Sequence, residues 1–150
     1  MLVRLVMPGV LLSLCVVVHA LVMTTMLRRL RRYAGPTVLR FWRDMGILIL
    51  VALYMMSAHL AEIGIWAFYL TSQNLFPDFR TSFYFSAVTY TTVGYGDLVL
   101  PDQWRLFAAA EALTGILMCG WSTGVFFAIV SRVYAAQPAE TTGVENVGRR

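Results

Sequence analysis

The chain has 150 residues, of which 59% are apolar and 13% are charged. Soluble domains are closer to about half apolar and a quarter charged, so this composition indicates one membrane-embedded domain. The net charge of +4 comes from twelve arginines and no lysine, and most of these arginines flank apolar runs. We therefore interpret the basic charge as a signal of membrane topology and expect no nucleic-acid partner.

The first apolar run covers residues 2–27 and is long enough to cross the ~30 Å hydrocarbon core of a bilayer as a helix. A cleaved signal peptide is the alternative. It fits poorly, because the run is long, small-residue cleavage signals are weak and four arginines follow closely. We expect a retained transmembrane helix over residues 1–27.

Residues 28–44 form a basic segment that contains six of the twelve arginines. Cytoplasmic loops carry such an excess, and Gly35-Pro36 should interrupt any continuous helix here. A voltage sensor is the alternative, but sensor arginines lie within an apolar helix and these cluster outside one. The arginines are also candidates for binding anionic membrane lipids: Arg28, Arg29, Arg31, Arg32, Arg40 and Arg43.

Two further apolar spans, residues 46–70 and 103–133, are also long enough to be transmembrane helices. With the basic segment inside the cell, the N-terminus lies outside and the third span returns the chain to the cytoplasm. Residues 71–103 are then expected on the outer side. The tail, residues 134–150, is short and polar, and we expect it to be disordered in the cytoplasm.

Residues 71–80 form a polar loop in which Asp78 has the side chain of a good helix N-cap. The mostly apolar and aromatic residues 79–91 favour a helix that is too short to span a bilayer. Such a segment suits a re-entrant helix, which enters the membrane and stops. The non-helical backbone that follows this helix is tolerated in the membrane only where other protein buries this backbone or where the backbone lines a watery cavity.

The sequence TTVGYGD, residues 91–97, interrupts the apolar pattern. A hairpin turn does not fit, because the flanks do not alternate, and a dinucleotide fingerprint fails at Val99. Gly94 and Gly96 permit backbone angles closed to other residues, and their alternation with ordinary residues can aim successive carbonyls to one side. These carbonyls and the Thr92 hydroxyl suit a dehydrated monovalent cation, and the lack of carboxylates argues against a divalent one.

This stretch resembles the selectivity filter of tetrameric potassium channels, whose signature is TVGYG. The resemblance extends along the two-helix pore module of bacterial channels. It implies an all-α membrane protein that forms a homotetramer and passes K⁺ ions, with no organic cofactor. The implied pore domain covers residues 45–133 and has four parts: an outer helix, 46–70; a pore helix, 79–91; the filter, 92–96; and an inner helix, 103–133. The N-terminal helix and the basic segment fall outside it.

By this resemblance, K⁺ is held by the Thr92 hydroxyl and by backbone carbonyls of the filter: Thr92, Val93, Gly94, Tyr95 and Gly96. Related non-selective channels carry an acidic residue at the Tyr95 position, so tyrosine favours K⁺ over Na⁺. Tyr84 aligns with a pore-helix position that braces the filter, and we predict a hydrogen bond from its hydroxyl to Asp97 at the outer mouth. Val88 stands where some bacterial relatives have a glutamate, so their inactivation behaviour is not expected here.

Three glycines, Gly115, Gly120 and Gly124, punctuate the third apolar span, and close helix packing is one explanation for them. Gly115 also aligns with the gating hinge of the family, where the inner helix can bend. Four residues recur at helical spacing and are candidates to line the cavity: Ile116, Cys119, Thr123 and Phe127. The last of these is expected to form a hydrophobic constriction near the inner mouth.

His59, Glu62 and Glu111 are ionisable residues inside apolar spans, so each is a candidate functional residue. His59 and Glu62 lie on one helix face, and a hydrogen-bonded structural pair is the favoured interpretation. A pH-sensing role is the alternative. A metal site of the Glu-x-x-His type would need the reverse order and further ligands. Glu111 is expected behind the pore helix, which it would anchor.

From these features we predict a potassium-selective channel of the cell membrane that conducts K⁺ passively. Two alternatives stay open: a weakly selective monovalent cation channel, and a non-conducting membrane subunit that assembles with other pore chains. An enzyme is not expected, because no Ser/His/Asp, Cys/His or carboxylate constellation converges on a pocket.

Overall fold

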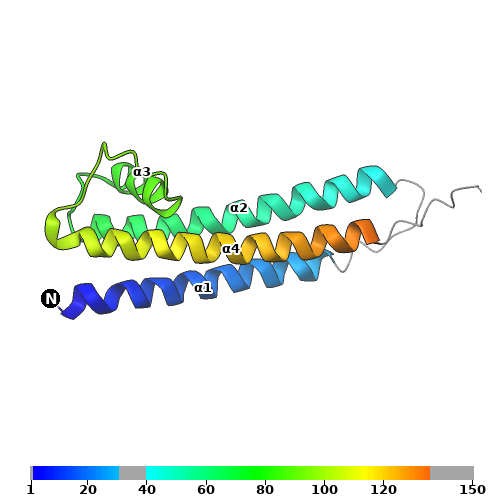
Figure 1. Ribbon diagram of the computed structural model, residues 1–150, viewed down its shortest axis with the longest axis horizontal. Helices are drawn as coiled ribbons and strands as arrows, with labels where there is room; N and C mark the ends of the chain where they lie inside the picture. The colour runs from blue at the N-terminus through cyan, green and yellow to red at the C-terminus, as the bar shows by residue number, and fades with distance from the viewer. Residues whose placement is uncertain (1, 31–39, 136–150) are drawn as a thin grey trace, which may run out of the picture.

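The computed structural model describes residues 2–30 and 40–135, and all regular structure within them is helical (Figure 1). The helices follow one another in this order: α1 (Leu2–Leu30), α2 (Arg40–Ser72), α3 (Phe79–Tyr90), a short 3-10 helix (Asp102–Trp104) and α4 (Arg105–Ala135). The all-α class expected from the sequence is confirmed for the described part of the chain.

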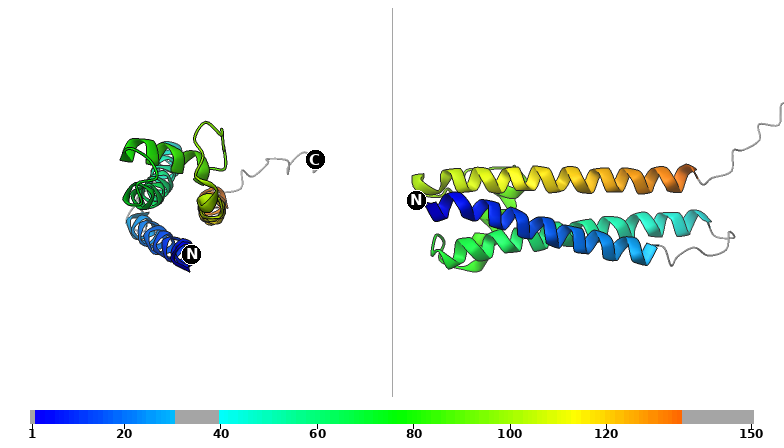
Figure 2. Two further views of the ribbon diagram at one scale, coloured as in Figure 1. Left: turned by 90° about the vertical axis from the view of Figure 1, so that its left-hand side faces the viewer. Right: turned by 90° about the horizontal axis from the view of Figure 1, so that it is seen from below.

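Three of these helices are long and apolar enough to cross a membrane. The candidate spans are Val6–Leu30, Trp42–Ser72 and Asp102–Arg132. In Figures 1 and 2 the helices α1, α2 and α4 lie side by side, and α3 lies against α2 and α4 at one end of the bundle. The chain is therefore a three-helix bundle with one short helix tucked into one end.

Helix boundaries differ from the predicted ones where the charged segment was expected to form a loop. Helix α1 continues to Leu30, and α2 begins at Arg40 although its apolar run begins at about residue 46. Nothing in residues 40–45 breaks a helix, so the end of an apolar run marks the limit of burial in lipid and not the limit of the helix. Gly35-Pro36, Arg31, Arg32 and residues 136–150 lie outside the described residues.

The short helix α3 has its N-terminus at the predicted place. The Asp78 carboxylate accepts a hydrogen bond from the Thr81 backbone N–H at 2.7 Å, which confirms Asp78 as the N-cap. This hydrogen bond lowers the pKa of Asp78 below its usual value, because it stabilises the charged form. Helix α3 therefore begins directly after the 71–78 loop, as expected from the sequence.

At its other end, α3 passes into the filter segment, which we define as residues 92–96. The Thr92 N–H donates to the Thr89 carbonyl at 2.9 Å, and the Gly94 N–H donates back to the Val88 carbonyl at 3.2 Å. The last carbonyls of α3, which have no partner within the helix, thus accept hydrogen bonds that fix the start of the filter segment. The half-buried Val88 contributes to this region through its backbone.

Helix α1 is an integral part of the hydrophobic core and not a loosely attached addition. Its Leu11 and Cys15 pack in one buried cluster with large aromatic residues of the other helices, including Trp66 and Phe107. The Trp66 and Phe107 rings meet edge to face, with centroids 5.0 Å apart. A second buried cluster joins the other end of α1 to α2 and α4.

Gly115 marks the place where α4 and the C-terminal end of α3 come closest. A Cβ atom at this position would lie 1.9 Å from the carbonyl oxygen of Tyr90, a distance at which the backbone of one helix must move. A Cβ at Gly120 or Gly124 would meet no atom of the described residues within 4 Å, apart from the neighbouring residues and backbone of its own helix. Close packing therefore accounts for Gly115, while α4 is one continuous helix from Arg105 to Ala135. The hinge role of Gly115 stays a prediction.

Replacing Gly115 with alanine should destabilise the protein by about 1–3 kcal/mol, because the added methyl group has to displace the end of α3. Thermal unfolding of the detergent-solubilised protein measures this effect. Gly120→Ala is the matched control, and we expect its unfolding temperature to stay close to that of the wild type. Equal stability of the two variants would contradict the close contact between Gly115 and Tyr90.

Candidate functional site

The filter segment has a backbone that alternates in the sign of φ. Thr92, Gly94 and Gly96 have φ values of +61°, +57° and +76°, whereas Val93 and Tyr95 between them do not have positive φ. This is the alternation that a one-sided row of carbonyls requires. The left-handed conformation of Thr92 was not predictable, because a residue with a Cβ atom adopts it only at a cost of about 1–2 kcal/mol.

The filter segment lies on the surface of the single chain. The Val93 and Tyr95 side chains are 52% and 72% exposed. Irregular backbone at membrane depth is stable only when it is buried by protein or lines a watery cavity. In a membrane, this surface therefore requires either a partner chain or an aqueous space.

The predicted hydrogen bond between Tyr84 and Asp97 is present. The Tyr84 hydroxyl donates to the Asp97 carboxylate at 2.7 Å and so ties the middle of α3 to the residue that follows the filter segment. This hydrogen bond raises the pKa of Tyr84, because the carboxylate holds the phenolic proton. The filter segment is thus held at both ends by α3: by the helix C-terminus at Thr92 and by Tyr84 at Asp97.

The four residues of α4 predicted to line a cavity are all exposed in the single chain: Ile116, Cys119, Thr123 and Phe127. The Thr123 hydroxyl donates to the Cys119 carbonyl at 2.8 Å, so it is satisfied within its own helix. The core of the chain uses the opposite side of α4, which includes Thr114, Met118 and Ser122. The predicted face is therefore available to other chains or to water.

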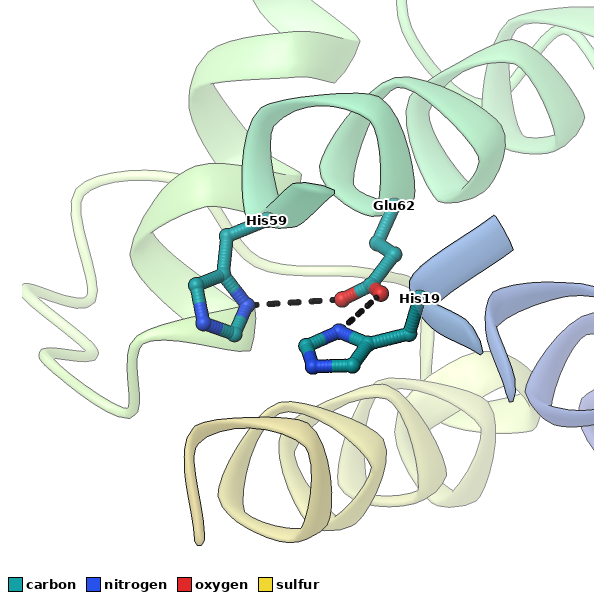
Figure 3. A group of neighbouring side chains, drawn as sticks. All are labelled: His19, His59 and Glu62. Atoms are coloured by element: carbon teal, nitrogen blue, oxygen red, sulfur yellow. Dashed lines mark hydrogen bonds and ion pairs between the residues drawn. The ribbon is translucent and has the colours of Figure 1, made fainter. Parts of the chain in front are cut away.

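Five polar residues from all four α-helices meet in a second location, which we call the polar cluster. They are His19 of α1, His59 and Glu62 of α2, Tyr90 of α3 and Ser122 of α4. Figure 3 shows that both imidazoles turn a nitrogen toward the Glu62 carboxylate. His19 and Glu62 are fully buried, and Tyr90 is almost fully buried. A charged or polar group in such a place must find partners inside the protein.

Every member of the polar cluster has at least two partners. The Glu62 carboxylate lies 2.8 Å from Nδ1 of His19 and 3.4 Å from Nδ1 of His59, and it accepts a hydrogen bond from the Tyr90 hydroxyl. The Tyr90 oxygen is also 3.1 Å from Nδ1 of His59. The Ser122 hydroxyl bridges the two Nε2 atoms, at 3.2 Å from His19 and 3.1 Å from His59.

The sequence pointed to only part of this cluster. His59 and Glu62 were expected to pair, and they do lie together. His19 meets the same criterion of an ionisable residue inside an apolar span and could have been singled out with them. Tyr90 and Ser122 could not be singled out in the same way, because an uncharged tyrosine or serine in a membrane helix does not by itself indicate a functional site.

Glu111 lies away from the polar cluster and faces α3. Its side chain is fully buried, and neither carboxylate oxygen has a hydrogen-bond partner among the described residues. The Ser86 hydroxyl of α3 is its polar neighbour. The structure thus places Glu111 behind α3, as expected, but the anchoring role stays a prediction.

Comparisons with known proteins agree with this arrangement. A family model described as "Ion channel" matches residues 47–132, which is more than half of the chain. The voltage-gated potassium channel regulatory subunit KCNG2 of Rattus norvegicus is 34% identical over 112 residues, which cover 69% of this chain and 22% of that protein. The subunit of the same name from Homo sapiens is 33% identical over 112 residues, with the same two coverages.

The chain therefore spans about a fifth of the length of the curated relatives that it matches. No solved structure matches the chain. The family match covers most of α2, all of α3 and the filter segment, and most of α4. Three helices are long and apolar enough to cross a membrane. This protein is an integral membrane protein that belongs to the pore-loop ion-channel family of the potassium-channel type.

Proposed function

We propose that this protein conducts K⁺ passively through a filter formed by residues 92–96 of four copies of the chain. The observation that carries the proposal is the alternating backbone of the TVGYG sequence. A row of carbonyl oxygens on one side of each chain can replace the water shell of K⁺. The row contains no carboxylate, which suits a monovalent ion better than a divalent one.

A homotetramer follows from the same proposal, because one chain supplies only a quarter of such a filter. The exposed filter segment and the exposed face of α4 support it. Large apolar residues on α4 are exposed in the single chain, including Ile116 and Phe127, which are 57% and 71% exposed. In the tetramer this face of α4 would line the cavity or contact a neighbouring copy.

The proposed orientation places the filter at the outer face of the membrane. The described arginines at the end of α1, the start of α2 and the end of α4 lie at the end of the bundle away from α3 (Figure 1). They are Arg28, Arg29, Arg43 and Arg132. An arginine-rich end is the cytoplasmic end by the positive-inside rule, and contacts with anionic lipids are a further proposed role.

A non-conducting subunit is the second candidate function. The observation that favours it is the name of the relatives, which are described as regulatory subunits of voltage-gated potassium channels. A weakly selective cation channel is the third. These candidates differ in what the purified chain does alone in a membrane.

The first prediction concerns the current itself. In planar bilayers with opposed K⁺ and Na⁺ gradients, the purified chain should give a reversal potential close to the K⁺ equilibrium value. Gly94→Ala should abolish the current, because alanine tolerates the φ of +57° poorly. Gly46→Ala is the control: this glycine has no unusual φ and no close neighbour, so its current should persist.

Other outcomes of this measurement decide between the alternatives. A reversal potential midway between the K⁺ and Na⁺ values would favour the weakly selective channel. Absence of current from the pure chain, together with altered currents when it is co-assembled with a conducting pore chain, would favour the regulatory subunit.

The second prediction concerns the bond from Tyr84 to Asp97. Tyr84→Phe removes one hydroxyl and with it the link between α3 and the outer end of the filter, so K⁺ currents should become less stable during sustained recording. Asp97→Asn, which weakens the same bond, should act in the same direction. Tyr54→Phe on α2 is the control. Unchanged currents in Tyr84→Phe would refute the supporting role of this bond.

A further inference from the structure

The polar cluster contains side chains that can bind a metal ion and that the proposed filter does not use. His19, His59 and Glu62 each offer one ligand atom, and these atoms all lie within 4.8 Å of one another. We propose that these three residues bind a divalent transition-metal ion of the zinc type, with the Tyr90 oxygen as the fourth ligand. This site is separate from the filter segment, and the proposal does not depend on conduction.

The orientation of the two imidazoles supports the site. Both turn Nδ1 toward the Glu62 carboxylate, at 2.8 Å for His19 and 3.4 Å for His59 (Figure 3). In a tetrahedral zinc site with bonds of about 2.0–2.1 Å, neighbouring ligand atoms are about 3.3 Å apart. The two nitrogens approach different oxygens of the Glu62 carboxylate, so the carboxylate would have to turn to present one oxygen to the ion. The three ligand atoms, which lie within 4.8 Å of one another, would have to draw together to this spacing. Two imidazoles and a carboxylate are a donor set that zinc uses in proteins.

Tyr90 is in position to complete the set. Its oxygen is hydrogen-bonded to Glu62 and lies 3.1 Å from Nδ1 of His59, so it borders the same space as the other ligand atoms. Bound as phenolate, it would join the Glu62 carboxylate in balancing the two positive charges of the ion. The apolar interior of a membrane protein favours a metal site that has no net charge.

Ser122 would orient both imidazoles through the ring nitrogens that do not bind the ion. Its hydroxyl oxygen lies 3.2 Å from Nε2 of His19 and 3.1 Å from Nε2 of His59. A metal ion on Nδ1 fixes the remaining proton of each ring on Nε2, and a hydroxyl oxygen can accept two hydrogen bonds. Both rings would then be oriented by one residue of α4.

Without a metal ion, the same geometry demands an additional proton. Five hydrogen bonds join the cluster. Each needs one proton, and Tyr90 and Ser122 supply two of the five. Two neutral imidazoles supply two more, so the fifth must be an added proton on a histidine or on Glu62. With the ion bound, the two Nε2 protons and the Ser122 proton suffice. One divalent ion thus replaces two protons, which leave to solvent, and the net charge of the cluster is unchanged.

Metal binding would join three helices at the base of the filter. The ligands come from α1, α2 and α3, and Tyr90 is the last residue of α3, two positions before Thr92. An ion here would therefore clamp the N-terminal helix to the end of the short helix that carries the filter segment. This would give α1, which lies outside the matched pore region, a structural task.

The chain offers a clean test, because His19 and His59 are its only two histidines. The full chain is purified in detergent with a histidine-free affinity tag, stripped with a chelator and equilibrated for a long period with Zn²⁺ or Co²⁺. We expect one ion per chain, a higher unfolding temperature with Zn²⁺, and the intense visible absorption of tetrahedral Co²⁺.

Variants then assign the ligands. His19→Asn, His59→Asn and Glu62→Gln should each weaken Zn²⁺ binding by at least tenfold, and Ser122→Ala should weaken it about 10–100-fold, as loss of an orienting partner does elsewhere. Glu111→Gln removes another buried carboxylate and is the matched control, which should bind Zn²⁺ like the wild type.

Two results would overturn the proposal. One is a wild-type protein that binds neither ion stoichiometrically or that gives Co²⁺ no tetrahedral absorption. The other is binding that persists at full strength in the ligand variants. The wild-type measurement alone decides the matter if a ligand variant does not fold. Each readout is independent of current, so a failure here is distinct from a failure of the proposed channel function.

Discussion

The structure depends on how the C-terminal end of α3 is held, because the filter segment begins there. Tyr90 is fixed from two directions. Its hydroxyl enters the polar cluster at Glu62, and its carbonyl lies against α4 where Gly115 leaves room for it. A backbone placed in this way leaves little freedom for the residues that follow, and Thr92 accordingly adopts a left-handed conformation that its side chain disfavours.

The bilayer explains why such an arrangement needs a polar core. Apolar contacts distinguish poorly between one helix orientation and another when the surrounding lipid is equally apolar. Hydrogen bonds among His19, Glu62 and Ser122 are directional, and they link α1, α2 and α4 at one level of the bundle. The polar cluster can therefore set the position of helices that the hydrophobic effect alone would leave free to slide.

Two parts of the molecule have separate roles in this view. The pore region, which matches the ion-channel family, carries the filter segment and an exposed face of α4. Helix α1 lies outside that match and contributes His19 together with buried apolar side chains. Whether the chain conducts alone or modifies another pore depends on the surfaces that a single copy leaves exposed, which include the filter segment and the side of α4 away from the polar cluster.

Much of the architecture was determined by the sequence itself, because the relevant signals are local. Long apolar runs predict spanning helices, and Asp78 begins α3. The hydrogen bond from Tyr84 to Asp97 was predicted from the resemblance to the potassium-channel pore module, and it is present. The alternation of glycines indicated the unusual backbone of the filter, although not the left-handed conformation of Thr92.

Tertiary structure alone decided the polar cluster and the contact at Gly115. His19 is 43 residues from Glu62 and 103 residues from Ser122, and no pattern along the chain relates them. Their meeting depends on the rotation and depth of each helix, which packing against neighbouring helices sets. Apolar composition specifies that a helix enters the membrane, but only its partners determine which of its faces meets which side chain.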